Sequence, residues 1–494
     1  MCERSNKKMG NWLFSVMIAF LLGFFLFNDL DIRYIYGYML LGAVLVGFLI
    51  KSAIDNGFGA AIKIRISSMR VLYASFSLLV VLFALLPNSN KEHEAMSIMI
   101  SMVIFAAYFL LAEPGKKEIK WICIAVQAVS ILFSVYIIYM TLNPQVFMKY
   151  IYPRLSSVSQ ASVDELMPLG YGAQIGGTPS YAIYVISFAL FMNEAKVMVG
   201  KARNFKQTAY IVISTVLYLT AILLVNLRAE MLAILATAFV LFVISLFFAD
   251  KKSRLYRMGA IAAIIVVQIV VLILLVPTGK IDRHINTVNQ FLPDGFKIGV
   301  SVQVPSENIP DNPIATTPSV DVAPPEKPSV DTNKLTSGRF ALWKKALELF
   351  EENPVFGIGW KQFVNNNTYK HNVHNTYLQW LCESGIVGFV LLFLLYVSMY
   401  LLTLIRTVRQ LRARDKVPYF VKEISFVSLG VQTLFAALHL MNPTFYHLFY
   451  FVFFSVTVLM IETSMRLEDV YTGEESDCLR KKIFAKKEKR MFFR

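Results

Sequence analysis

The chain alternates long apolar stretches with shorter polar connections over most of its length. A helix needs roughly 20 residues to cross about 30 Å of hydrocarbon. Stretches suited to this lie at 11–28, 34–51, 70–87, 95–112, 119–142, 180–194, 207–227, 229–249, 257–277, 385–405, 422–442 and 444–463. Because only helices and closed barrels satisfy their backbone polar groups in lipid, the pattern predicts an all-α integral membrane protein with about 12 transmembrane helices.

The composition points to the same solvent. Hydrophobic residues make up 56% of the 494 residues and charged residues only 16%, against roughly 25% charged in an ordinary soluble protein. Lys and Arg together number 48 and Asp and Glu 33. In a membrane protein such an excess usually marks cytoplasmic loops held near anionic lipid. We therefore expect membrane lipids as partners and no nucleic acid.

Cationic residues recur in alternate connections, which predicts the orientation in the membrane. They concentrate at 51–70, 116–120, 196–206, 251–257 and 406–416, and again in the tail from 480 to 494. The run from Trp12 to Phe27 has a basic start but no cleavage signal, so we expect it to remain as the first span. Both termini are then expected in the cytoplasm.

Two connections on the opposite, outer side are long, at 143–179 and at 278–384 between the ninth and tenth spans. Within the second, 304–333 is rich in Pro, Ser, Thr and Asp without helical periodicity, which predicts a disordered insertion. The expected divisions are helices 1–9 in 1–277, the large outer loop in 278–384, helices 10–12 in 385–463 and a basic cytoplasmic tail in 464–494.

The end of the large outer loop has a different texture. Apolar residues recur at helical spacing at Phe340, Trp343, Ala346, Leu347 and Phe350. A plausible cap at Ser337 and the stop signal Asn353-Pro354 predict an amphipathic helix from 339 to 350, outside the membrane core. A glycine turn follows, and then a polar segment from His374 that leads into the tenth span.

The stretches GRFALWKKALELFEENPVFGIGWKQF and HNVHNTYLQWLCESGIVG resemble the shared signature of the O-antigen ligase and O-antigen polymerase superfamily of bacterial envelope glycosyltransferases. The resemblance covers roughly 337–391. It implies transfer of a glycan from an undecaprenyl diphosphate carrier to an acceptor hydroxyl, at the outer face of the bacterial cytoplasmic (inner) membrane, without metal, nucleotide sugar or other cofactor. The family's GT-C-like layout, with a large outer loop before a late span, agrees with the topology expected here.

The resemblance also implies roles for three residues. His374 is the expected base, because a neutral imidazole is well suited to take a proton from a hydroxyl near pH 7. Arg339 and Arg228 are expected to hold the departing diphosphate, since a guanidinium presents a planar, permanent charge to phosphate oxygens. The alternatives are a helix-capping histidine, a solvated helix start for Arg339, and an arginine at 228 that reaches lipid phosphate.

Other residues near these segments are candidates for substrate binding. They are Arg154, Trp343, His371, Tyr377 and Glu383. Each has an ordinary alternative, because loop arginines are commonly just exposed and aromatic residues gather at membrane interfaces. For Glu383, the alternatives are hydrogen bonding that orients a catalytic partner and satisfaction of the backbone at a helix break.

Metal binding is the weaker interpretation of two pairs of residues. His371 and His374 have ligand spacing but no acidic third ligand in the same motif. Asp29 and Asp31 resemble the acidic pair with which some lipid-linked-sugar transferases hold a divalent ion, but they lie in a very short turn. We expect no metal, and chelator sensitivity would favour the metal-dependent alternative.

Two functional classes remain open, a glycan transferase and a flippase for the lipid-linked oligosaccharide. Within the first class, a polymerase uses another carrier-linked repeat unit as acceptor, whereas a ligase uses a lipid or protein anchor. We prefer a polymerase of capsular or O-antigen-like polysaccharide that acts with other polysaccharide-assembly proteins. Transporters commonly place charges at the bilayer midplane and show two related halves, whereas this chain keeps its charges mostly at the ends of spans.

Overall fold

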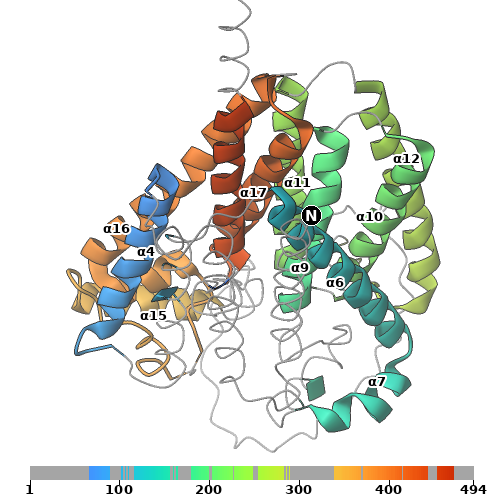
Figure 1. The fold of residues 1–494 in the computed structure, drawn as a ribbon. Coiled ribbons are helices and arrows are strands. Elements are labelled where there is room, and N and C mark those ends of the chain that lie inside the picture. The colour runs from blue at the N-terminus through green and yellow to red at the C-terminus, as the bar shows by residue number, and fades with distance from the viewer. Residues whose placement is uncertain are drawn as a thin grey trace, which may run out of the picture.

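The computed structural model describes residues 66–89, 116–155, 180–199, 203–225, 227–248, 254–282, 339–368, 371–413, 416–442 and 453–471, with a few isolated positions between them. Every regular element in these ranges is helical (Figure 1). The first, second and fourth expected spans lie wholly or almost wholly outside the described residues. So do the insertion at 304–333, the acidic pair Asp29 and Asp31, and the tail beyond 471.

The long helices follow the expected spans closely. They are α4 (Ser68–Leu85), α6 (Lys116–Leu142), α9 (Ser180–Met198), α10 (Phe205–Val225), α11 (Arg228–Phe248), α12 (Arg254–Leu275), α16 (Thr376–Arg412), α17 (Tyr419–Leu438) and a helix at 453–471. Shorter elements are α7 (Pro144–Tyr150), 3-10 turns at Tyr152–Arg154 and Val276–Thr278, and α15 (Arg339–Glu352). Among the described residues, seven helices are long and apolar enough to cross a membrane, so this is a multi-pass membrane protein.

The tenth span starts earlier than the expected residue 385. Helix α16 already begins at Thr376, because the side chain of Asn375 caps it by accepting a hydrogen bond from the Leu378 amide at 3.0 Å. At Gly385 the backbone leaves the helical region, and the helix resumes beyond it. The polar segment that carries His374 therefore leads into a helix that starts outside the apolar run.

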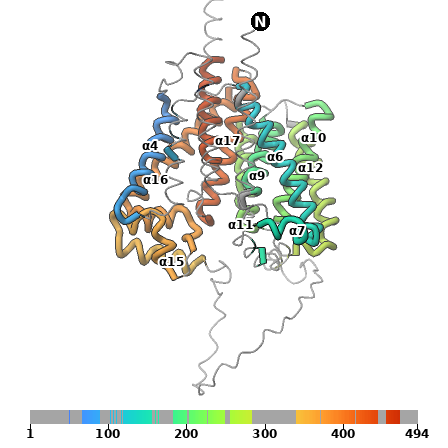
Figure 2. The backbone as a smooth tube through the Cα atoms, turned by 60° about the horizontal axis from the view of Figure 1, so that its bottom comes forward, coloured from blue at the N-terminus to red at the C-terminus, as the bar shows by residue number. Residues whose placement is uncertain are grey.

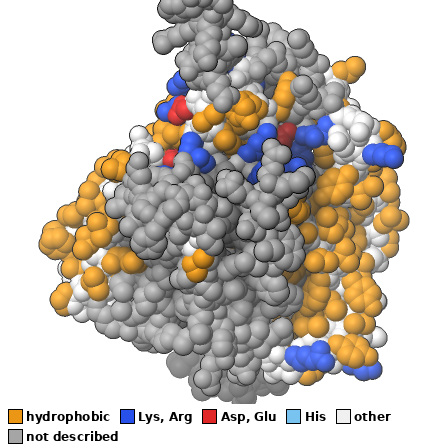
Figure 3. Space-filling view, in the orientation of Figure 1, with side chains coloured by type: hydrophobic (Ala, Val, Ile, Leu, Met, Phe, Trp, Pro, Cys, Tyr) orange, Lys and Arg blue, Asp and Glu red, His pale blue; other side chains and the backbone are white. Residues whose placement is uncertain are grey.

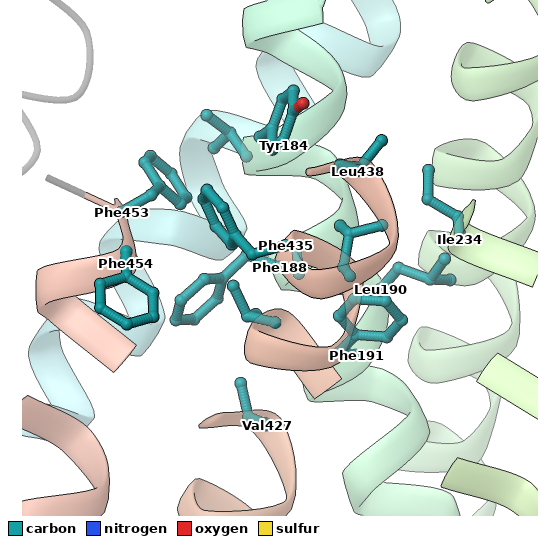
Figure 4. Close-up of a cluster of buried hydrophobic side chains, with 14 of the residues drawn as sticks. Tyr184, Phe188, Leu190, Phe191, Ile234, Val427, Phe435, Leu438, Phe453 and Phe454 are labelled. Carbon is teal, nitrogen blue, oxygen red and sulfur yellow. The ribbon is translucent and has the colours of Figure 1, made fainter. Parts of the chain in front are cut away.

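Helix α9 forms the centre of the bundle, since every residue from 182 to 193 is buried. It packs against α6, α10, α11 and α17. Figure 4 shows aromatic rings at this centre, where Phe188 meets Phe453 at 5.9 Å and Tyr184 meets Phe435 at 5.7 Å between ring centroids. By contrast, only 11% of the apolar stretch of α12 is buried inside the bundle. Its aliphatic side chains therefore face lipid.

The two ends of the bundle carry different chemistry. Helices α7 and α15, from the two long connections expected on the outer side, lie at the same end in both views (Figures 1 and 2). Cationic side chains meet partners near the other end: Arg203 pairs with Glu423 at 2.7 Å, and Arg412 lies 4.6 Å from the Phe248 ring centre. Figure 3 shows Lys and Arg side chains across the upper part of the molecule and a smaller group at the lower right.

Candidate functional site

Helix α15 lies against the start of α16. Its inward residues Leu342, Ala346 and Leu349 recur at helical spacing and are buried with Phe363 and Val373 in one small apolar cluster. The helix expected from the sequence is thus present and reaches Glu352, but Phe340 and Leu347, two of the apolar residues that predicted it, are exposed, at 49% and 43%. Trp343 packs against the same cluster, while Arg339 opens the helix and is partly exposed.

The glycine turn after α15 inserts into the break in α16. Gly357, Gly359 and Gly385 all have positive φ, at 70°, 106° and 64°. The amides of Ile358 and Gly359 donate to the carbonyls of Cys382 and Glu383, each at 2.9 Å, and the Ile386 amide donates to the Pro354 carbonyl at 2.8 Å. Backbone groups released by the break are therefore satisfied by the turn.

Glu383 binds the same turn through its side chain. One carboxylate oxygen accepts from the Lys361 amide at 2.8 Å, and the other accepts from the Phe363 amide and the Gln379 side chain, both at 3.1 Å. Glu383 as a whole is only 1% exposed. Of the two roles expected for Glu383, these contacts match the satisfaction of backbone groups, although the backbone groups belong to the glycine turn and not to the helix break.

The turn also docks onto the end of α4. The Trp360 amide donates to the Ser89 hydroxyl at 3.0 Å, and that hydroxyl donates to the Phe83 carbonyl at 2.7 Å. Trp360 is buried, and a side chain at Gly359 would collide with the backbone of Asn88. Three segments distant in sequence thus hold one another in place.

His374 immediately precedes Asn375, the cap of α16, and is half-buried. Its φ of 54° lies in the left-handed region, which a non-glycine residue adopts only when its surroundings hold it there. Its ring centre is 6.5 Å from that of His371, which is exposed. The segment thus presents two imidazoles in different environments.

Contacts at the start of α16 join it to α17 and α11. The Thr376 amide donates to the His439 carbonyl, and the Thr376 hydroxyl donates to the Asn442 carbonyl, both at 2.7 Å. The Asn442 side chain then donates to Glu230 at 2.9 Å. Because Glu230 lies two residues after Arg228, these bonds hold the half-buried Arg228 and His374 on joined helix ends.

Both arginines open a helix, Arg228 for α11 and Arg339 for α15. The unpaired amides at a helix N-terminus and the helix dipole favour an anion there. A guanidinium at the same place adds a full positive charge and a bidentate donor. The chemistry of these two helix starts is therefore suited to phosphate oxygens.

The remaining candidates lie in two different settings. Tyr377 packs its ring on Trp380, Phe393 and His439, and its hydroxyl donates to the Ala436 carbonyl at 3.3 Å, which are the contacts of a packing residue. Arg154 is exposed at the end of the 3-10 turn that packs against α7, and α7 lies at the same end of the bundle as α15.

Sequence reasoning missed the residues that join the helix ends, namely Glu230, Asn442 and Thr376. One signal was available, because an acidic residue in the first turn of an apolar span is costly to bury and usually has a specific partner. Glu230 is such a residue and is 4% exposed. Its partner Asn442 comes from more than 200 residues away, so the pairing itself could not be anticipated.

Among the described residues, no group of three or more His, Cys, Asp or Glu side chains is placed to hold a metal ion. Comparison with family models gives one finding: residues 213–393 match the family described as O-antigen ligase. The match runs from α10 into α16 and includes Arg228, Arg339 and His374. No curated protein matches the chain significantly.

Proposed function

This chain belongs through residues 213–393 to the O-antigen ligase family of glycosyltransferases, and on that premise we propose a reaction and a site for it. The enzyme transfers a glycan from a carrier lipid diphosphate to an acceptor hydroxyl, at the outer face of the bacterial inner membrane. In this orientation both termini are cytoplasmic, and α7 and α15 lie on the outer side. Undecaprenyl diphosphate is the proposed carrier.

In the proposed reaction, His374 takes the proton from the acceptor hydroxyl as its oxygen attacks the anomeric carbon. The bond between that carbon and the diphosphate oxygen breaks, and the carrier diphosphate leaves with the electron pair. Arg339 and Arg228 bind the charge that develops on the diphosphate. Attack opposite the leaving group inverts the configuration at the anomeric carbon, and no metal takes part.

The observation that carries the proposal is that hydrogen bonds link the start of α11 to the start of α16. Residues 228 and 374 are far apart in sequence, yet Thr376, Asn442 and Glu230 join the start of α11 to the start of α16, just after His374, through hydrogen bonds of 2.7 and 2.9 Å. A base and a phosphate-binding arginine must share one site to serve the two ends of a glycosyl transfer. The same bonds have no such use if Arg228 only reaches lipid headgroups.

We take polymer growth as the working assignment. In that case the acceptor is another carrier-linked repeat unit of a capsular or O-antigen-like polysaccharide. In a ligase the acceptor is a lipid or protein anchor. The two enzymes need the same base and the same diphosphate-binding groups, so they differ in the product they make.

The first experiment measures glycan transfer in proteoliposomes from a purified carrier-linked oligosaccharide. We expect His374→Ala to lower the rate by about 10²–10⁴-fold, the usual contribution of a general base. Arg339→Ala should lower it by about 10²–10³-fold, as for other groups that stabilise developing charge. Chelator should leave the wild-type rate unchanged.

Lys344→Ala is the matched control for Arg339, because it removes an exposed cation from the same helix. His371→Ala tests which of the two imidazoles is the base. Full activity of correctly folded His374→Ala and Arg339→Ala would overturn the site, and loss of activity with chelator would favour the metal-dependent alternative. A ladder of products identifies a polymerase, and carrier movement between leaflets without transfer identifies a flippase.

A further inference from the structure

A crevice opens between α6, α9 and α17 at the end of the molecule opposite α7 and α15. Its volume is about 200 Å³. The walls are largely apolar and include Ile124, Met192 and Phe420, while Lys120 and Lys196 add two ammonium groups. No residue proposed for glycan transfer lines this crevice, so its use is a separate question.

The described lining of the crevice has an excess of positive charge. Lys120 and Lys196 face one carboxylate in this lining, that of Glu423. Glu423 is already paired with Arg203 at 2.7 Å. Glu423 also attracts the Lys196 ammonium, so this one carboxylate is set against three cations, Lys120, Lys196 and Arg203, and the group keeps a net positive charge that suits an anion.

The crevice also opens toward the lipid. Lys120, Cys123, Ile124 and Gln127 follow one face of α6 at helical spacing, and all four line the crevice. Lys120 is exposed and Ile124 is 43% exposed, whereas Cys123 and Gln127 are less exposed. A ligand can therefore enter from the side of the bundle, where the spans meet hydrocarbon.

We propose that this crevice binds one anionic phospholipid of the cytoplasmic leaflet. The phosphate is held by Lys120 and Lys196, and part of an acyl chain lies along Ile124, Met192 and Phe420. A soluble phosphate would use the two lysines and leave the apolar wall in water, whereas a phospholipid covers both. In the proposed orientation this end of α6, α9 and α17 lies at the cytoplasmic surface.

The test uses native mass spectrometry of the full-length protein in mild detergent, after lipid removal and titration with phosphatidylglycerol. Wild type should retain one phosphatidylglycerol at low lipid concentration. Lys120→Gln combined with Lys196→Gln should weaken its retention about 10-fold or more, because each lysine contributes to attraction of an anionic headgroup. Phosphatidylcholine, which carries no net charge, should bind more weakly to wild type.

The matched control combines Lys117→Gln with Lys206→Gln, which removes the same charge from exposed sites at the same end outside the lining. It should retain lipid as wild type does. Ile124→Trp keeps both lysines and fills the opening, so it should also weaken binding and gives a test that does not alter charge. Equal retention by all variants, no retained lipid in wild type, or displacement by millimolar inorganic phosphate would overturn the proposal.

Discussion

Gly385 is the residue at which α16 breaks, and its φ of 64° is unfavourable for any residue with a side chain. A Cβ there would also collide with the backbone of Val355 and Phe356 in the glycine turn. The break and the turn satisfy each other's backbone groups, so neither can shift alone. The geometry around this residue therefore leads to a specific expectation for substitution.

We expect Gly385→Ala to destabilise the protein by about 1–3 kcal/mol or more, from left-handed strain and the collision. It should also lower glycan transfer by displacing the turn. Gly259→Ala is the control, because Gly259 lies in α12 with nothing within 4 Å of an added Cβ. Thermal unfolding in detergent and transfer assays would measure both; an unfolding temperature for Gly385→Ala equal to that of wild type contradicts this account.

Glu383 is expected to act as a positioning residue. In Glu383→Gln, one carboxylate oxygen becomes an NH₂ group that faces the amide donors of Lys361 or Phe363. We expect the turn to loosen and kcat to fall about 10-fold or more, with the pH dependence of kcat unchanged because the proposed base, His374, is still present.

The control for Glu383 is Glu348→Gln on α15. Glu348 is 45% exposed and pairs only loosely with Lys345 at 3.4 Å, so its loss should change stability and transfer little. A shift of the kinetic pKa in Glu383→Gln would instead indicate that Glu383 takes part in proton transfer. An unchanged kcat would mean that the turn does not depend on this carboxylate.

At the scale of elements, α11, α16 and α17 meet through Asn442, which links two helix ends with its carbonyl and its side chain. We expect Asn442→Asp to be worse than Asn442→Ala, because it places a second carboxylate against buried Glu230. Transfer should fall while the helical content, measured by circular dichroism, stays near that of wild type.

The double variant Asn442→Asp/Glu230→Gln tests whether the contact between these two side chains is responsible for the loss of transfer. Adding Glu230→Gln to Asn442→Asp supplies an amide that can donate to the new carboxylate, so part of the lost transfer should return. Failure of the second substitution to restore any activity would show that the Asn442 side chain acts by another route. The single variant Glu230→Gln provides the fourth corner of the cycle.

At the scale of the whole molecule, a buried ion pair joins α4 to the helix at 453–471. Arg70 and Glu462 meet at 2.8 Å with side chains only 2% and 6% exposed, and Ser67 donates to the same carboxylate at 2.8 Å. Removing one member of such a pair leaves a buried charge without its partner. We expect Glu462→Gln to destabilise the protein by about 3–5 kcal/mol.

Arg409→Gln is the comparison for that substitution. Arg409 is 67% exposed and lies 3.6 Å from Glu468, whose buried carboxylate keeps a hydrogen bond from the Gln410 side chain at 2.9 Å, so the loss of Arg409 should cost only about 1 kcal/mol. Chemical denaturation in detergent, followed by tryptophan fluorescence, would compare the two. Similar losses in both variants would show that the buried pair does not hold the first and last described helices together.

Sequence patterns predicted most of the described helices, because burial in lipid demands long apolar runs that hydropathy reveals directly. Helix α15 was predicted from a helical period of apolar residues and the stop at Asn353-Pro354, but its buried face contains Leu342, Ala346 and Leu349, and not Phe340 or Leu347. The start of α16 was missed, since its first turns contain Gln379 and Glu383 and do not read as a span. These polar groups are tolerated because the turn around Lys361 satisfies them.

What the sequence by itself determined is the class of molecule and the long helices of the bundle, and it supplied the short list of candidate residues for the proposed glycan transfer. Hydropathy and motif spacing are local properties, and they suffice for these conclusions. The tertiary structure decided which helix ends meet, which carboxylates serve the backbone, and that Asn442 links α16 to α11. Those contacts join residues hundreds of positions apart, and their energies depend on burial and geometry that exist only in the packed chain.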